Sequence, residues 1–189
     1  MNKIGLAVLL CIILAGKISA QSVALKTNLL YDLTTSPNIG VEMGVNRHIT
    51  IDVSVGTNPW MFPDNKSLQH VKLQTEFRYW PLERMFGHFF GVYTHQIRYD
   101  LRKFDYIPSM IEENHRFDGI GFGGGISYGY SLYLSPRWNL EFVLGGGFTY
   151  LEYDKHQYGT EGTAEYLGRF RTNYFGVNRI GVSIVYIIK

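Results

Sequence analysis

Apolar and polar residues alternate with a period of two in eight separate runs of this chain. The run from Ile39 to Val45, for example, sets apolar residues against Gly40, Glu42 and Gly44. Successive side chains of a β-strand point to opposite faces, so each run has one apolar and one polar face. The runs occupy residues 23–32, 39–45, 49–56, 70–79, 88–98, 120–134, 138–150 and 179–189. The pattern predicts eight strands.

The first 20 residues have the composition of an export signal. A positive charge at Lys3 precedes an uninterrupted apolar run from Ile4 to Ala15, and the small residue Ala20 stands where signal peptidase would cut. The run is too short to cross a bilayer as a mature helix. We expect residues 1–20 to be a signal peptide, the alternative being a buried N-terminal helix. Residues 21–189 then form one exported domain, because no tandem repeat or low-complexity linker divides them.

The charges of the exported part are balanced. The chain has 18 Lys plus Arg and 16 Asp plus Glu, and the two surplus cations, Lys3 and Lys17, both lie in the export signal. A dedicated nucleic-acid-binding protein carries a basic surplus, which this body lacks. The single cysteine, Cys11, also lies in the signal, so the exported part has no disulfide or cysteine metal site. We expect no nucleic-acid partner and no cofactor.

Charged residues stand in the middle of the polar faces, beside glycines. Glycine weakens a strand that faces water, but it is useful where side chains converge inside a narrow ring of strands. An unpaired charge there would be costly, so we expect the charges to pair, with Glu76 reaching a cation on a neighbouring strand. The expected lumen charges are Lys26, Glu42, Asp52, Lys72, Glu76, Arg78 and Glu141.

The connectors between the predicted strands differ in length on the two sides. The short turns are Asn46–His48, Pro81–Gly87 and Ser135–Arg137, and the long connectors opposite them are residues 57–69, 99–118 and 152–168. Short turns on one side and long loops on the other are typical of outer-membrane barrels, with both chain ends in the periplasm. The long loops mix charged and aromatic residues, a composition suited to a protein or glycan partner, the alternative being mobile loops without a partner.

Aromatic residues gather near the ends of the predicted strands. At a membrane surface, Tyr and Trp rings form belts at the level of the lipid headgroups. Ordinary core aromatics would lie at strand centres, as Phe77, Phe122 and Phe142 do. The expected interfacial aromatics are Tyr31, Trp60, Tyr79, Trp80, Trp138, Tyr150 and Tyr186.

Together these features predict an all-β fold, an eight-stranded antiparallel up-and-down transmembrane β-barrel whose apolar faces contact lipid. The chain leaves about 21 residues for each strand and its connector, which suits the smallest membrane barrels. The alternative architecture is a secreted water-soluble barrel that holds its apolar face inward and binds a small apolar ligand.

Four stretches of the body are more distinctive than a generic amphipathic strand. They are Ala24–Asp32, the Thr34–Asn38 turn, the tripeptide Asn58-Pro59-Trp60 and Gly181–Tyr186. With them the chain resembles a domain-of-unknown-function family of small outer-membrane β-barrel proteins from Gram-negative bacteria. The resemblance implies a barrel in the cell outer membrane, with outer-membrane lipid as its partner, and it implies no activity and no catalytic residues.

The sequence favours a structural or surface-interaction role over catalysis. A narrow lumen filled by side chains leaves no wide pore. The alternative is a lipid-modifying enzyme of the outer membrane, whose candidate residues near the outer rim would be His70, His95, His115, Ser67, Ser109, Asp100 and Glu112. Their spacing does not guarantee a base beside a nucleophile, and no metal-binding spacing such as His-Glu-x-x-His occurs. We therefore predict neither a catalytic nor a metal site.

Overall fold

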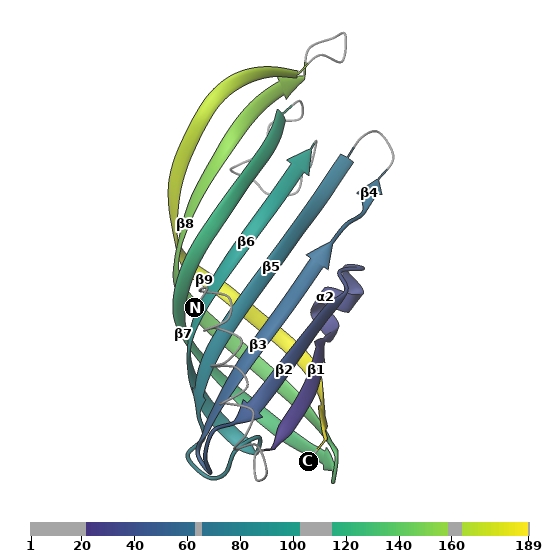
Figure 1. The fold of residues 1–189 in the computed structure, drawn as a ribbon, viewed down its shortest axis with the longest axis vertical. Helices are drawn as coiled ribbons and strands as arrows, with labels where there is room; N and C mark the ends of the chain where they lie inside the picture. Colours follow the sequence, from purple (N-terminus) through teal and green to yellow (C-terminus); the bar gives the residue numbers. More distant parts are fainter. Residues whose placement is uncertain (1–21, 63–65, 103–114, 159–163, 189) are drawn as a thin grey trace, which may run out of the picture.

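The computed structural model describes residues 22–62, 66–102, 115–158 and 164–188 of the chain. The predicted signal peptide, residues 1–20, lies outside them. The described part is almost entirely β-structure, drawn as long tilted strands in Figure 1. The elements are β1 (Val23–Asn28), α2 (Leu29–Leu33), β2 (Asn38–Gly44), β3 (Ile49–Asn58), β4 (Met61–Phe62), β5 (Lys66–Tyr79), β6 (Gly87–Arg102), β7 (His115–Ser135), β8 (Trp138–Tyr158) and β9 (Ala164–Ile187).

Eight of these strands form one closed, barrel-like ring. Each is antiparallel to both neighbours, in the order β1, β2, β3, β5, β6, β7, β8 and β9. The last strand returns to the first, where Ala24 lies opposite Ile187 and Asn28 opposite Ser183. The two-residue strand β4 adds to the edge of β5. The prediction of an all-β fold with eight antiparallel strands is confirmed.

The two faces of the ring have opposite character. The outer face is apolar, and its side chains include Phe77, Ile126 and Phe175, which are 58%, 70% and 84% exposed. The inner face is polar, and Glu76 and Arg78 are almost completely buried there. Alternation along each strand produces this separation, since neighbouring residues point to opposite faces. A water-soluble globular protein has the reverse distribution, with apolar residues inside.

The two ends of the ring also differ. Short turns join β2 to β3, β5 to β6 and β7 to β8 at one end, which we call the turn end, and the last strand also ends there (Figure 1). The opposite end, which we call the α2 end, contains the helix and is uneven. There β1 and β2 have only 6 and 7 residues, whereas β7, β8 and β9 have 21, 21 and 24.

The long strands continue into segments that the sequence predicted as loops. Of the predicted loops 99–118 and 152–168, residues 99–102, 115–118, 152–158 and 164–168 are strand, and the remaining residues lie outside the described ones. The physical reason is that cross-strand ion pairs and aromatic contacts hold these residues in the ladder. We call the parts of β6, β7, β8 and β9 beyond the ends of β1 and β2 the extension. In Figure 1, β7, β8 and β9 rise past the other strands, and β6 ends level with β5.

The first strand is shorter than predicted, because the chain turns into α2 after Asn28. The side chain of Asn28 caps the helix by accepting a hydrogen bond from the backbone N–H of Leu30 at 3.0 Å. Asn38 accepts a hydrogen bond from the Asn28 N–H at 2.6 Å and donates one to Asp32 at 2.9 Å. These contacts turn the segment that was predicted as strand into five helical residues. No helix among the described residues is long and apolar enough to cross a membrane.

Candidate functional site

Three carboxylates meet side by side inside the ring. Glu42 on β2 lies opposite Asp52 on β3, and Asp52 lies opposite Glu76 on β5. All three side chains point inward and are buried. Like charges directly opposite each other destabilise a sheet, so this row of carboxylates requires cations between its members.

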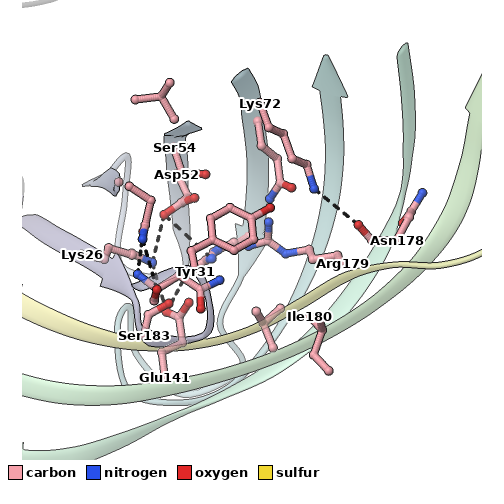
Figure 2. A pocket seen from close by; sticks show the side chains of 18 residues that line it. Lys26, Tyr31, Asp52, Ser54, Lys72, Glu141, Asn178, Arg179, Ile180 and Ser183 are labelled. Atoms are coloured by element: carbon pink, nitrogen blue, oxygen red, sulfur yellow. Dashed lines mark hydrogen bonds and ion pairs between the residues drawn. The ribbon is translucent and has the colours of Figure 1, made fainter. Parts of the chain in front are cut away.

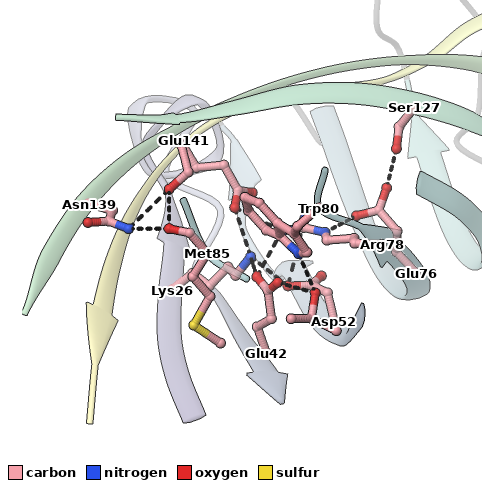
Figure 3. A network of polar contacts seen from close by, with 12 residues as sticks. Lys26, Glu42, Asp52, Glu76, Arg78, Trp80, Met85, Ser127, Asn139 and Glu141 are labelled. Carbon is pink, nitrogen blue, oxygen red and sulfur yellow. Dashed lines mark hydrogen bonds and ion pairs between the residues drawn. The ribbon is translucent and has the colours of Figure 1, made fainter. Parts of the chain in front are cut away.

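Arg78 is the central cation of the interior (Figure 3). Its Nη1 donates to Glu42 at 2.9 Å and to Glu141 at 2.8 Å, and its Nε donates to Glu76 at 2.5 Å. The side chain is 1% exposed, and its guanidinium lies over the ring of Phe89 at 4.4 Å. One buried arginine therefore links carboxylates from β2, β5 and β8.

Lys26 on β1 supplies a second buried cation. Its Nζ lies 3.0 Å from Asp52 and 3.0 Å from Glu141, and it also pairs with Glu42. The second oxygen of Glu42 accepts a hydrogen bond from Thr50 at 2.5 Å. The carboxylates are thus held by both charge and hydrogen bonding, which is the condition under which buried charges are tolerated.

Glu76 pairs both along its own strand and across the ring. It accepts hydrogen bonds from Arg78, two residues further on in β5, from Arg179 on β9 at 2.7 Å, and from Ser127 on β7. We expected only partners on neighbouring strands. The contact with Arg78 forms because the long arginine side chain bends back inside the narrow ring. Arg179 was not among the expected lumen charges, although it shares the phase of Gly181 and Ser183.

Lys72 is inside the ring but stands apart from the carboxylates. Among the described residues, no carboxylate lies within ion-pair distance of its Nζ, which donates to the backbone carbonyl of Asn178 at 3.5 Å. With Lys72 included, the described residues at this level of the interior comprise four cations and four carboxylates. The cations are Lys26, Lys72, Arg78 and Arg179, and the carboxylates are Glu42, Asp52, Glu76 and Glu141. We call these eight residues the lumen charge network.

Aromatic residues and a turn fill the ring below the lumen charge network, at its turn end. Trp80 is completely buried, donates its indole N–H to Thr50 at 2.9 Å and packs on Phe89 with a centroid distance of 4.7 Å. Beyond it, the carbonyl of Met85 accepts hydrogen bonds from Asn139 at 2.7 Å and from Ser131 at 3.1 Å. The β5–β6 turn therefore contributes to the interior packing.

Two of the seven expected interfacial aromatics lie inside the ring, and those predictions are wrong. Trp80 follows the outward-facing Tyr79 and therefore has the inward phase of Arg78. Tyr31 is turned inward by the helical turn of α2, so that it lines a cavity and its ring meets that of His70 edge to face. The other five are not buried: Trp60, Tyr79, Trp138, Tyr150 and Tyr186. Their interfacial role stays a prediction.

The extension carries ion pairs on its outer face. Asp100 accepts hydrogen bonds from Arg102 at 2.8 Å and from Arg116 at 2.7 Å. Partial burial would raise the pKa of Asp100, but the two arginines outweigh burial and hold its pKa below the usual value. On the neighbouring strands, the hydrogen bond from Arg169 lowers the pKa of the exposed Asp154 carboxyl. These pairs hold the long strands together where the sequence predicted loops.

Three of the residues considered for catalysis, His95, Asp100 and Ser67, are bound to partners that do not link them to one another as nucleophile, base and acid. His95 lies 3.1 Å from Thr149 Oγ1, and Asp100 is held by two arginines. Ser67 donates weakly to a backbone carbonyl, at 3.4 Å. Ser109 and Glu112 lie outside the described residues. In the part of the chain that the structure describes, no cluster of three or more His, Cys, Asp or Glu residues could hold a metal ion.

The fold and the interior define a class of protein: an all-β protein whose closed ring of eight antiparallel strands surrounds a buried network of ion pairs. Residues 6–188 match the model of the family described as Protein of unknown function (DUF3575), and the chain belongs to that family. The expected membership of a domain-of-unknown-function family is thereby confirmed. Neither the curated proteins nor the solved structures contain a match to the chain.

Proposed function

We propose that the chain is an integral β-barrel protein of the outer membrane of Gram-negative bacteria, with a structural or surface-interaction role. The observation that carries the proposal is the reversed distribution of side chains. The outer face of the ring is apolar and exposed, whereas the interior is charged and buried. An aqueous environment would favour the opposite arrangement, whereas a lipid environment favours this one.

The height of the apolar outer face supports this proposal. On β8 the outward side chains are mostly apolar from Trp138 to Tyr150. With about 3.3 Å per residue and a strand tilt of about 40°, this stretch spans roughly 30 Å along the ring axis, close to the apolar band of about 25 Å in outer-membrane barrels. Closure of the ring also leaves most strand edges paired, as a bilayer interior requires. The same outer face argues against the water-soluble alternative.

Within the same proposal, the remaining features have roles that follow from their chemistry. Residues 1–20 would direct export, and the five outward aromatics would lie at the levels of the lipid headgroups. The extension would project from the membrane at the α2 end, where its ion pairs and aromatic residues offer a surface to a protein or glycan partner. The lumen charge network serves the structure, because it fills the ring and holds the strands together.

Fractionation and heat-modifiability test the proposal together. We expect the protein to sediment with the outer membrane, to need detergent for extraction, and to migrate differently on a gel before and after boiling. A folded barrel resists unfolding by the detergent of the gel at low temperature, which produces the two positions. Recovery of the folded protein from the periplasm without detergent would contradict membrane insertion.

A further inference from the structure

A cavity of about 140 Å³ lies inside the ring between the lumen charge network and α2. Figure 2 shows Tyr31 reaching across it from α2, with Lys72 and Arg179 on the far side. Asn178 and Gln74 also line it. The volume is large enough for several water molecules or one small ion with its own oxygen atoms. Most of the residues that line the cavity are polar or charged, which favours a polar ligand.

The charged side chains that line the cavity include more cations than carboxylates. Six charged side chains line the cavity: the cations Lys26, Lys72, Arg78 and Arg179 and the carboxylates Asp52 and Glu141. Of the cations, Lys72 and Arg179 make no ion pair with either of these carboxylates, because Arg179 pairs with Glu76. Asp52 and Glu141 are instead paired with Lys26 and Arg78, which also bind Glu42. The network as a whole is neutral, but its cavity end has a surplus of positive charge.

Two cationic groups at the cavity have hydrogen-bonding capacity left over. The side chain of Arg179 is nine-tenths buried, and its Nε has no hydrogen-bond partner among the described residues. The Nζ of Lys72 can donate three hydrogen bonds, and its contact with the Asn178 carbonyl is long, at 3.5 Å. A buried donor without an acceptor is costly, so these groups create a demand for acceptor oxygens in the cavity.

The same groups are close enough to act on one ligand. Lys72, Arg179 and Tyr31 all line this one cavity. The three side chains come from β5, β9 and α2, which lie around the cavity. An arginine fork, an ammonium and a hydroxyl are donors that bind the oxygens of phosphate and carboxylate groups.

We propose that this cavity is a binding site for a small oxyanion, with phosphate as the best-matched group. Lys72 and the free Nε of Arg179 supply charge and hydrogen bonds, and Tyr31 supplies a hydroxyl from the α2 side. A bound oxyanion satisfies the unpartnered donor and offsets the local surplus of positive charge. The site does not rest on membrane insertion, because it is formed entirely by the interior of the ring.

The test is a calorimetric titration of the purified full chain, folded in detergent, with inorganic phosphate at constant ionic strength. We expect the wild type to bind phosphate and Lys72→Gln to bind it at least tenfold more weakly. Arg171→Gln is the matched control, because Arg171 lies on β9 but faces outward, beside Glu152. Its affinity should equal that of the wild type. Heat-modifiability of each variant verifies folding separately.

A second measurement needs no variant. Phosphate that binds only the folded state should raise the temperature at which the wild type unfolds, in proportion to the logarithm of its concentration. Glycerol 3-phosphate distinguishes a free anion from a lipid headgroup: binding tighter than inorganic phosphate assigns the site to a headgroup, and weaker binding assigns it to the free anion. Absence of phosphate binding by the folded wild type, or equal binding by Lys72→Gln, would overturn the proposal.

Discussion

Arg78 illustrates how a single side chain determines the stability of the interior. It contacts Glu42, Glu76 and Glu141 at once, and it is 1% exposed. Arg78→Met would leave these carboxylates buried with too little compensating charge. Removing one partner from a buried ion pair costs about 3–5 kcal/mol, so we expect a clearly lower unfolding temperature, measured by heat-modifiability in detergent.

The control for this change is Arg171→Met on the exposed outer face of β9. Arg171 donates to Glu152 at 3.0 Å, but its side chain is largely exposed. Exposed ion pairs contribute about 0–1 kcal/mol, so the unfolding temperature should barely change. Equal effects of the two substitutions would show that the lumen charge network does not stabilise the fold.

Gly91 tests the close packing around Glu76. A Cβ added at Gly91 would lie 2.6 Å from Glu76 Oε1 and 2.5 Å from Ser127 Oγ, which is too close for either atom. Gly91→Ala should therefore separate Glu76 from Ser127 and destabilise the protein by about 1–3 kcal/mol in urea unfolding. Gly40→Ala is the matched control, because its Cβ would meet Ser54 at an ordinary 3.4 Å. Equal losses in the two variants would contradict this account.

At the scale of single residues, alternation predicts which way a side chain points more reliably than what it contacts. It predicted the inward orientation of Glu42, Asp52 and Glu141, because period two leaves no choice once one face is apolar. The same rule applied further would have found Arg179 and Trp80. The separation of Lys72 from the carboxylates was not predictable, since it depends on how far neighbouring strands are shifted along one another.

At the scale of elements, the extension shows where charge misleads a sequence prediction. Mixed charges near Asp100, Arg116 and Asp154 resemble solvent-exposed loops, yet these residues form cross-strand pairs that continue the ladder. Such pairs require partners that are distant in sequence, so a local pattern cannot reveal them. The helical turn α2 escaped prediction for a similar reason, because Asn38 stabilises it from another strand.

The pairs of the extension imply a pH dependence. The pKa of Asp100 is lowered in the folded state, so its contribution to stability is present above its unfolded pKa and is lost as the pH falls through the folded pKa. Amide hydrogen exchange, corrected for the intrinsic effect of pH, should show less protection of the C-terminal end of β6, around Asp100, at pH 3 than at pH 6. Asp100→Asn should show the reduced protection already at pH 6. A wild-type extension equally protected at both pH values would contradict the prediction.

The outer face of β7 offers a test that rests on the proposed membrane location. Ile126 lies near the middle of the apolar stretch and Leu134 near its turn end, and both are exposed. In a bilayer, Ile126→Arg should cost about 2–4 kcal/mol and Leu134→Arg about 0–1 kcal/mol. Urea unfolding from lipid vesicles measures the difference. In water both positions are equally solvated, so similar costs would argue against a lipid-facing ring.

At the scale of the whole molecule, closure and filling of the ring belong together. A ring of eight strands is narrow, so its interior must be occupied by side chains. The charged side chains of the network, the Trp80–Phe89 pair and the β5–β6 turn at Met85 occupy successive levels of it. The sequence predicted the number of strands and their faces. It did not predict the uneven wall, because strand length at the α2 end depends on long-range pairing.

This filling predicts the electrical behaviour of the protein in a planar lipid bilayer. The cavity beside α2 ends at the lumen charge network, and Arg78 and Trp80 close the path toward the turn end. Ions would have to displace buried, paired charges to pass, so the inserted wild type should show no stable conductance steps under an applied voltage. An open-pored porin inserted under the same conditions is the positive control. Steady steps of uniform size from the purified wild type would show that the lumen is an open channel.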